Sequence, residues 1–525
     1  MPVILKGTIQ KRTALECALV FAVFLGLCFR LAGLFSANLW TDEVWSAALS
    51  KETLVHIVGL TLRYDSHPPL YYLQLHLWQL LSENDAWLLT NSLLYSIASA
   101  ISLFFVLRSL YGRAEACVGL AVLSVTPLAV VFAETLRMYA LENLLAVWMF
   151  YVAERIVRFD PRRTRHSVIF VILGSAINLL HGFGAMVTFF ICIYTFVRAF
   201  QERLSGRVFR RLLIVGFAVG LSTSYSVVVG SMRQTIGLST PDSLSILSEL
   251  TISLMGFNIP APQFASLIFI FPFIGLCLSD YRSRTVIWWL FIAPTLLMIW
   301  ISVSFKPVYT FRATGLFLPF LAVGFAIFAC RRKVRIEIPT DVQPTATLDR
   351  AVVVTFLMVL SVTSLYNTAT YRKASFERIS TFWAARSLPG DAVYVNSFES
   401  DYLGFVRYLP GVVKPMVHEV EAPPPLHWQK IFAHLGPVWV RRLDLLPDTD
   451  HLVYNNRFIY PSFDRLSVMN RFRFWILQTK GQMCELPDYR TTIVEADGPY
   501  SIVLCESIAT NLAQKHRISN SLAPD

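Results

Sequence analysis

Two adjacent carboxylates, Asp42 and Glu43, stand shortly after an apolar segment, residues 14–35, that is long enough to cross a bilayer. An acidic pair at a membrane surface is costly to keep unless the protein uses it. A carboxylate at the mouth of a membrane cavity can take a proton from a hydroxyl or an amine. Residues 36–85 are therefore interpreted as an outer loop that carries part of an active site.

Other residue types suited to acid–base and phosphate chemistry occur at the same predicted ends of the apolar segments. Arginine and lysine can hold a phosphate leaving group and stabilise its growing negative charge, arginine in bidentate fashion. Aromatic side chains nearby can stack on sugar rings. The polar set is Asp65, His67, Glu134, Arg137, His181, Lys306 and Arg312, and the aromatic set includes Trp40, Trp45, Tyr71, Tyr72 and Tyr139.

Each of these residues also has a purely structural interpretation. Asp42 can be the N-cap of a helix predicted to include residues 44–49. His181 can cap a helix end, the basic side chains can extend to the membrane surface, and the aromatic residues can form an interfacial belt. Taken together, the residues favour a functional interpretation. One membrane face gathers acidic, basic and phosphate-binding residues, while the other holds almost only arginine and lysine.

The elements that must position these residues are membrane helices. The chain has 525 residues, of which 55% are hydrophobic and 15% charged, and its mean hydropathy is +0.52. This composition is too apolar for a soluble enzyme of this size. We expect about eleven transmembrane helices, at residues 14–35, 86–107, 114–133, 140–157, 167–180, 182–200, 209–230, 262–279, 285–304, 312–330 and 351–367.

The distribution of basic residues predicts the topology. Clusters of arginine and lysine fall on alternate connections, which marks these connections as cytoplasmic. The N-terminus is then cytoplasmic, and the loops that carry Asp42, Arg137, His181 and Arg312 lie outside. The first helix lacks a small-residue cleavage pattern and is expected to be retained. Residues 1–367 hold 29 basic and 19 acidic residues, so topology explains +10 of the net charge of +11, and no basic patch is left for nucleic acid.

Residues 368–525 differ from the membrane region, residues 1–367, in composition. An amphipathic helix is predicted over residues 375–388, residues 411–425 are expected to form an extended loop, and strand-like runs recur. This alternation predicts a C-terminal periplasmic α/β domain. Cys484 and Cys505 lie in it and can either form a disulfide or remain free thiols. The strand-like runs are residues 392–395, 438–440, 451–454, 474–477 and 502–504.

Several motifs resemble those of the bacterial GT-C glycosyltransferases, a superfamily that includes protein O-mannosyltransferases, the lipid A aminoarabinose transferase and lipopolysaccharide galacturonosyl transferases. The likeness begins with Asp42-Glu43 in the first outer loop, followed by His67-Pro68-Pro69 and an aromatic-rich amphipathic helix at residues 70–78. Arg137-Met-Tyr139 is similar to the Arg-x-Tyr motif of the family. Residues 306–313 resemble a late motif, in which a basic residue usually directly precedes tyrosine, whereas Val308 stands there in this chain.

The resemblance implies a GT-C fold, a multi-pass protein of the bacterial inner membrane and an inverting sugar transfer. A polyprenyl-phosphate sugar is the expected donor, with Asp42 as general base and Glu43 orienting the acceptor or a metal. Arg137, with Lys306 or Arg312, is expected to hold the donor phosphate, and His67 and Tyr139 to bind it or shape the pocket. Trp40, Tyr71 and His181 are expected in the acceptor or sugar pocket. No cofactor is certain, and a divalent cation held by Asp42, Glu43 and His67 is an open alternative.

Two rival functions are considered. A flippase for lipid-linked sugars would also need many membrane helices, but such a transporter is expected to show inverted repeats, and we find no internal repeat in the sequence. A ligase that moves a whole glycan from a lipid diphosphate remains a second alternative. The acceptor can be lipid A, lipopolysaccharide core, another envelope glycan, a lipid or a protein, and no residue selects the sugar.

Overall fold

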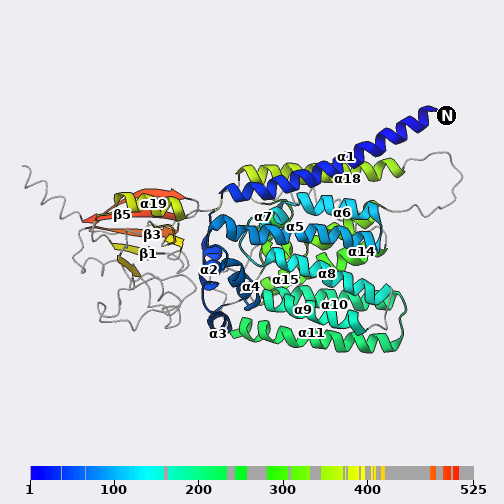
Figure 1. Cartoon of the computed structure of the whole chain (residues 1–525), viewed down its shortest axis with the longest axis horizontal. Helices are drawn as coiled ribbons and strands as arrows, with labels where there is room; N and C mark the ends of the chain where they lie inside the picture. The colour runs from blue at the N-terminus through cyan, green and yellow to red at the C-terminus, as the bar shows by residue number, and fades with distance from the viewer. Residues whose placement is uncertain are drawn as a thin grey trace, which may run out of the picture. The chain divides into compact units, whose positions relative to one another are not determined.

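The computed structural model divides the chain into two compact units. The first contains residues 1–37 and 53–371, and the second contains residues 38–52 and 372–525. Each unit is described by itself (Figure 1). The structure describes residues 2–36, 38–65, 67–158, 164–232, 243–256, 281–305, 309–330, 345–370, 373, 376–388, 392–396, 404–405, 407–409, 416–419, 473–479, 489–497 and 500–507.

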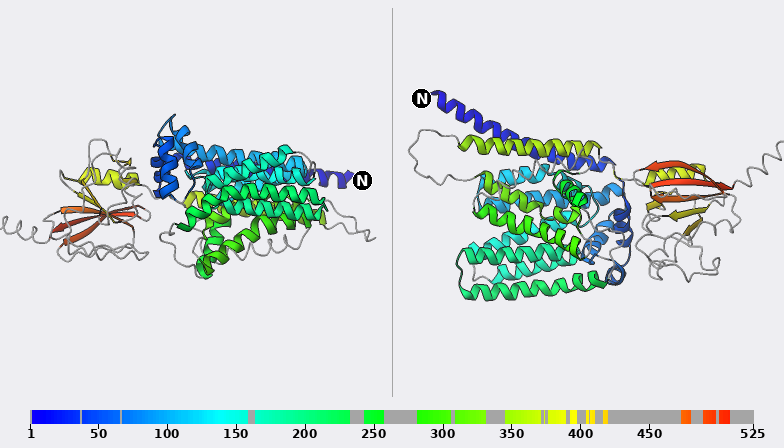
Figure 2. Two further views of the ribbon diagram at one scale, coloured as in Figure 1. Left: turned by 90° about the horizontal axis from the view of Figure 1, so that it is seen from below. Right: turned by 180° about the vertical axis from the view of Figure 1, so that it is seen from behind.

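The described part of the first unit is a bundle of α-helices (Figures 1 and 2). Its elements are α1 (Pro2–Ala32), η1 (Gly33–Ser36), α3 (Leu54–Tyr64), α4 (Leu70–Gln79), α5 (Asp85–Leu110), α6 (Arg113–Val125), α7 (Pro127–Ala133), α8 (Tyr139–Arg158), α9 (Thr164–Leu180), α10 (Gly184–Gln201), α11 (Gly206–Met232), α12 (Ser243–Met255), α14 (Tyr281–Ile287), the π-helical turn η2 (Trp288–Ile292), α15 (Ala293–Ser304), α16 (Phe311–Gly315), α17 (Leu318–Ala329) and α18 (Thr345–Thr370).

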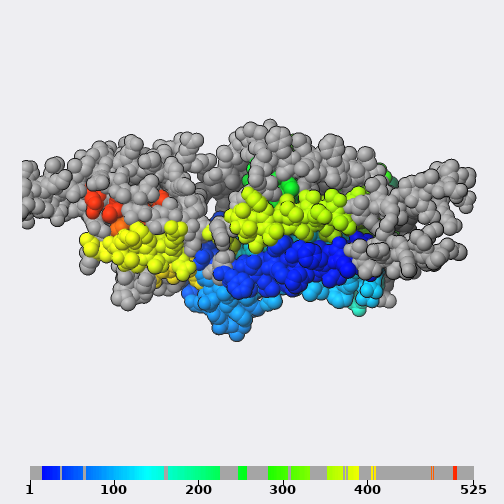
Figure 3. Space-filling model, turned by 90° about the horizontal axis from the view of Figure 1, so that it is seen from above, coloured from blue at the N-terminus to red at the C-terminus, as the bar shows by residue number. Residues whose placement is uncertain are grey.

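Five helices of the described residues are long and apolar enough to cross a membrane, and six if a bent pair counts as one. They begin at Leu15, Asp85, Gly184, Arg282 and Val352. α5 packs between α6 and α8, and α8 packs on α9 and α10. Figure 3 shows α1 and α18 side by side along one face of the unit. The chain is thus a helical membrane protein. One predicted span, residues 262–279, lies outside the described residues.

Two spans that the sequence predicts as continuous are broken. Residues 114–133 form two helices, α6 and α7, bent by 68° at Thr126-Pro127. Proline lacks the N–H that would continue the backbone ladder, and its ring crowds the preceding turn. Residues 312–330 likewise form the short α16 and the longer α17, which has Pro319 in its first turn. The sequence predicted one helix in each place, and the structure has two.

The described strands of the second unit form one five-stranded sheet of order β2-β1-β3-β5-β4. β1 pairs in parallel with β2 and β3, whereas β5 pairs antiparallel with β3 and β4. The helix α19 packs on β4 and β5, and Trp383 of this helix packs on Phe405. The elements are α2 (Thr41–Leu49), α19 (Phe376–Arg386), β1 (Ala392–Asn396), β2 (Met416–Glu419), β3 (Arg473–Thr479), β4 (Tyr489–Asp497) and β5 (Tyr500–Ser507).

The sequence located α19, β1, β3 and β5 of this unit correctly. It missed β4, and it was wrong about residues 411–425, because the strand β2 lies where an extended loop was expected. β2 follows Pro415 and joins the edge of the sheet, a place where a neighbouring proline is tolerated. The predicted strands at residues 438–440 and 451–454 lie outside the described residues.

Candidate active site

The turn before α4 holds His67 through a neighbouring carboxylate. Asp65 ends α3, and its side-chain Oδ1 accepts the backbone N–H of His67 at 2.8 Å. This local turn directs the chain into Pro68-Pro69, whose fixed φ angles suit the start of a helix. Asp65 is buried and His67 is half-buried. The His67 ring lies 5.0 Å from the ring of His181, so this loop contacts the turn between α9 and α10.

The charges of Asp65 and Arg137 both act on the phenol of Tyr72. Burial raises the pKa of the Tyr72 phenol well above its ordinary value, the negative charge of Asp65 raises it further, and Arg137 opposes the rise. Tyr72 therefore keeps its proton at neutral pH and can only be a hydrogen-bonding phenol. Arg137 is 4% exposed and lies in the turn between α7 and α8. Its backbone N–H donates to Thr135 O at 2.7 Å, which fixes the turn.

A buried carboxylate–imidazole pair stands next to this turn. Glu142 in the first turn of α8 and His181 after α9 are both buried, and Glu142 Oε2 lies 2.9 Å from His181 Nδ1. This contact orients the imidazole ring through Nδ1 and leaves Nε2 as the other ring nitrogen. The His181 ring also contacts that of Tyr139 at 5.4 Å. The sequence analysis missed Glu142, although an acidic residue inside a predicted span at residues 140–157 was a usable signal.

The late motif is held by α12. The backbone N–H of Phe311 donates to Glu249 Oε2, and Ser253 Oγ donates to Phe311 O at 3.2 Å. Arg312 follows in α16, and its positive charge acts on Glu249. Burial raises the pKa of the Glu249 carboxyl, against the opposing effects of the Phe311 N–H and Arg312. The late motif thus places its arginine within electrostatic reach of Glu249, an acid that the sequence did not single out. Lys306 lies outside the described residues.

A chain of contacts joins the late motif to the Arg137 turn. Gly315 of α16 lies against the Phe132 side chain of α7, where a Cβ would come within 2.5 Å of the ring. Phe132 in turn stacks on Tyr139 with ring centroids 4.7 Å apart. Tyr309, before α16, is buried, and burial raises its pKa to about 12. The first unit therefore gathers the predicted residues His67, Arg137, Tyr139 and His181, and α16 with Arg312 packs beside them.

The acidic pair Asp42-Glu43 belongs to the second unit. Trp40 is the N-cap of α2, so the structural interpretation of Asp42 as an N-cap is wrong, and Asp42 lies inside the first turn, half-buried. Glu43 is completely buried, and both of its carboxylate oxygens are engaged. Oε1 lies 2.8 Å from Lys373 Nζ, and Oε2 accepts the backbone N–H of Trp40 at 3.0 Å. The phenol of Tyr408 also accepts the Leu39 N–H at 2.9 Å.

The remaining predicted residues have simpler surroundings. Tyr71 of α4 is buried with its ring against Tyr72. In the described part of the chain, no group of three or more histidine, cysteine, aspartate or glutamate residues is arranged to hold a metal ion. Cys505 lies on β5, and Cys484 lies outside the described residues.

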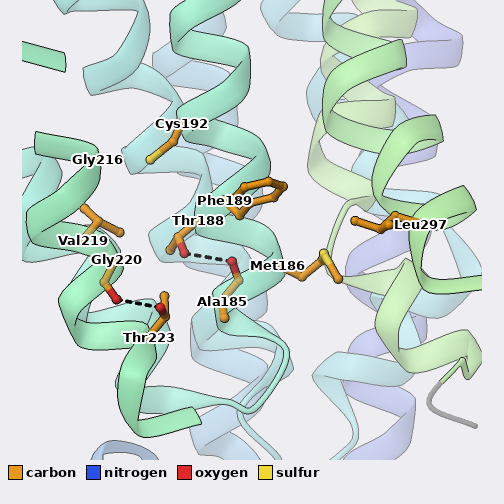
Figure 4. A pocket seen from close by; sticks show the side chains of 10 residues that line it. All are labelled: Ala185, Met186, Thr188, Phe189, Cys192, Gly216, Val219, Gly220, Thr223 and Leu297. Atoms are coloured by element: carbon orange, nitrogen blue, oxygen red, sulfur yellow. Dashed lines mark hydrogen bonds between the residues drawn. The ribbon is translucent and has the colours of Figure 1, made fainter. Parts of the chain in front are cut away.

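An apolar pocket of about 360 Å³ lies elsewhere, between α10, α11 and α15 (Figure 4). Its hydroxyl groups are bonded internally, since Thr188 donates to Asn178 and Ala185 and Thr223 donates to the Gly220 carbonyl. Gly216 and Gly220 form part of its wall. The pocket is therefore unlike the polar cluster around Arg137 and suits only an apolar group.

No protein-family model and no curated protein sequence matches the chain. Solved structures do match. ArnT from Cupriavidus metallidurans bound to undecaprenyl phosphate aligns with a TM-score of 0.50 and 14% identity over 92% of this chain and 97% of that one. The apo state of the same ArnT aligns with a TM-score of 0.50 and 15% identity over the same shares. The Archaeoglobus fulgidus oligosaccharyltransferase aligns less closely, with a TM-score of 0.39 and 10% identity over 74% of this chain and 61% of that one. The two ArnT alignments show that the chain shares the fold of ArnT.

Proposed function

We propose that the protein is a membrane glycosyltransferase that moves a sugar from a polyprenyl-phosphate donor to an acceptor outside the cytoplasm. The observation that carries the proposal is the buried Arg137, whose charge acts on Tyr72 and which stands two residues before Tyr139. The Tyr139 ring contacts His181, and the His181 ring contacts His67. α7 and α9 end at this cluster, and α8 and α10 begin there, so it lies at one end of the bundle. The positive-inside pattern makes this the outer end. The shared fold with a protein solved with undecaprenyl phosphate supports a lipid-linked donor.

The donor phosphate binds at the polar end of the bundle while its lipid stays in the bilayer. Arg137 supplies a buried guanidinium that can bind two phosphate oxygens at once. Arg312, or Lys306, supplies the second positive charge. His181 is oriented by Glu142, so that its Nε2 can bind a polar group of the donor, with His67 and Tyr139 packed around it.

The transfer itself is a single displacement in this proposal. Asp42 takes the proton from the acceptor hydroxyl, and the acceptor oxygen attacks the anomeric carbon on the face opposite the phosphate. The bond between that carbon and the phosphate oxygen breaks, and the polyprenyl phosphate leaves with the electron pair. Arg137 and its second cation stabilise the charge that develops on the phosphate. The reaction requires α2 to bring Asp42 to the outer end of the bundle.

Glu43 has a supporting role in this proposal. Because its carboxylate oxygens are engaged by Lys373 and the Trp40 N–H, Glu43 holds α2 rather than the acceptor or a metal. The C-terminal unit, which is periplasmic in this topology, helps to select the acceptor. The acceptor is an envelope glycan or glycolipid of the lipid A or lipopolysaccharide type, and the protein resides in the bacterial inner membrane.

Mass spectrometry of the envelope glycolipids tests the proposal. A deletion strain is compared with the same strain complemented by the wild-type gene. The proposal predicts that deletion removes one sugar from an envelope product and that complementation restores it. Membranes supplied with a radiolabelled polyprenyl-phosphate sugar should then attach the label covalently to the acceptor. Movement of the labelled lipid across the bilayer without attachment would instead support a flippase.

A further inference from the structure

We infer that Arg30, in the last turn of α1, is a positioning residue that holds the break between α6 and α7 and thereby sets the place of Arg137. This inference rests on the proposed function for its link to catalysis. Arg30 is 3% exposed, although it belongs to an apolar helix with the composition of a membrane span. A buried charge inside such a helix is costly and needs partners. Its guanidinium donates to Gly26 O of α1 at 2.9 Å, and its other partners lie on α5 and α6.

The break leaves the last carbonyls of α6 without their ordinary donors. The carbonyl of Leu123 would accept the N–H of residue 127, which is a proline. The bend of 68° also interrupts the ladder for the two following carbonyls. Inside a bilayer no water is present to satisfy such groups, so each needs a donor from the protein.

Side chains supply a donor to each of the last four carbonyls of α6. Thr126 Oγ1 donates to Val122 O at 2.7 Å, and Ser364 Oγ of α18 donates to Val125 O at 2.8 Å. Arg30 donates to the two carbonyls between them. Its Nη2 donates to Leu123 O at 3.1 Å, and its Nη1 donates to Ser124 O. Its Nε donates to Ser96 Oγ of α5 at 3.0 Å. A single guanidinium thus replaces backbone donors that the bend removes.

The shape of α1 fits this arrangement. Gly26, Arg30 and Gly33 are spaced by four and three residues and therefore share one face of the chain as it leaves the helix. A Cβ at Gly26 would lie 2.2 Å from Ser124 O, and a Cβ at Gly33 would lie 2.2 Å from the Glu134 side chain. The two glycines allow α1 and η1 to approach the break and the turn after α7 at backbone distance.

The bend matters because α7 is short and leads directly into the Arg137 turn. α7 has seven residues and ends at Ala133, four positions before Arg137. If α6 continued straight, residues 134–139 would be carried away from His181 and α4. Arg30 is also subject to the charge of Glu134, the first residue of this turn. The geometry assigns to Arg30 a positioning role. It sets the place of Arg137, which is proposed to bind the donor phosphate, and does not itself contact the donor.

The test uses the purified full-length protein in lipid nanodiscs with undecaprenyl phosphate as the probe. Arg30→Met keeps a long apolar side chain but removes every donor. It should lower the unfolding temperature and weaken undecaprenyl phosphate binding by about tenfold or more, the scale expected for misplacing a phosphate-binding group. Arg108→Met, at an exposed position near the end of α5, is the matched control and should change neither quantity.

A second substitution separates positioning from stability alone. In the double variant Arg30→Met with Pro127→Ala, residue 127 regains an N–H for the Leu123 carbonyl and α6 can continue by backbone bonds. We expect this variant to recover much of the lost unfolding temperature while undecaprenyl phosphate binding stays weak. Recovery of both would overturn the inference, because Arg30 would then only stabilise. Unchanged stability and binding in Arg30→Met would overturn it as well.

Two further measurements keep the test decisive. If Arg30→Met does not fold, Ser364→Ala removes one donor from the same break and is expected to weaken binding in the same direction by a smaller factor. Hydrogen exchange of the backbone amides of residue 126 and residues 128–133 reports the break without any ligand, and it should rise in Arg30→Met. If the wild-type protein itself fails to bind undecaprenyl phosphate, the proposed function fails, whereas the exchange result still supports or rejects the role of Arg30 in holding the break.

Discussion

Lys373 Nζ lies 2.8 Å from Glu43 Oε1, and this ion pair ties α2 to the segment that follows α18. Glu43 is completely buried, and the Lys373 side chain is 11% exposed. The two residues are 330 positions apart, so the pair joins distant parts of the chain within the second unit. It fixes α2, the helix on which Asp42 lies.

Removing the lysine of this pair should therefore be more harmful than removing both charges. Lys373→Met leaves a buried carboxylate without its partner and is expected to cost about 3 kcal/mol of unfolding free energy. Adding Glu43→Gln should recover a large part of that loss. Chemical denaturation in detergent micelles measures both variants. Equal destabilisation of the single and double variants would show that the ion pair does not hold α2.

Arg137 is expected to act through the bidentate geometry of its guanidinium. Arg137→Met should lower sugar transfer by about 10²–10³-fold, the usual effect of removing one group that stabilises developing charge. Arg137→Lys keeps the charge but not the paired donors. Its transfer rate should therefore lie between those of Arg137→Met and the wild type. Steady-state transfer rates with an undecaprenyl phosphate binding assay check this order. Wild-type activity in Arg137→Met would remove this residue from the site.

The turn between α9 and α10 should not tolerate the methyl group that an alanine would add at Gly184. A Cβ there would lie 2.2 Å from the backbone oxygen of Ile177, and the Gly184 N–H already donates to His181 O at 3.0 Å. We expect Gly184→Ala to cost about 1–3 kcal/mol of stability and to displace His181. Gly59→Ala in α3 is the matched control, because nothing lies within 4 Å of its Cβ position. Equal stability of the two variants would contradict the close packing.

Glu249 predicts a pH dependence of stability. Folding raises the pKa of this carboxyl above its ordinary value of 4.5, chiefly by burial. A carboxyl of this kind contributes fully to stability below its ordinary pKa, and the contribution is lost as pH rises through the raised pKa. Glu249→Gln, which can still accept the Phe311 N–H, should therefore be more stable than the wild type at pH 7.

The difference between Glu249→Gln and the wild type should shrink as the pH is lowered toward 4.5. Thermal unfolding across this range measures it, with Glu83→Gln at an exposed loop position as the control. A gap between Glu249→Gln and the wild type that widens at low pH would contradict the direction of the pKa shift.

The sequence predicted the long apolar helices well, because hydrophobic length is a strong local signal. The span predicted at residues 86–107 is α5, and that at 182–200 is α10. The sequence did not predict the bend at Pro127, although proline inside an apolar run was a visible warning. The β4 strand was missed although it contains threonine, isoleucine and valine, which favour strands. These residues do not alternate regularly with polar ones, and the place of β4 depends on its pairing with β5.

The candidate site was predicted in part for a related reason. Arg137, Tyr139, His67 and His181 lie at the ends of apolar segments, so topology alone predicts that they share a face. Glu142 and Glu249 complete the site through contacts with residues 39 and 62 positions away, and spacing along the chain carries no information about such contacts. Arg30 was missed because its donors serve backbone carbonyls, which the sequence does not reveal.

The most direct test of the account is the activity of Asp42→Asn, which keeps the shape of the side chain but cannot take a proton. The lipid-linked sugar fraction extracted from the deletion strain serves as donor, and transfer to envelope acceptors by the purified protein is measured. If Asp42 is the general base, transfer should fall by about 10²–10⁴-fold, with unchanged unfolding temperature and undecaprenyl phosphate binding. Near wild-type transfer by a correctly folded Asp42→Asn protein would contradict it.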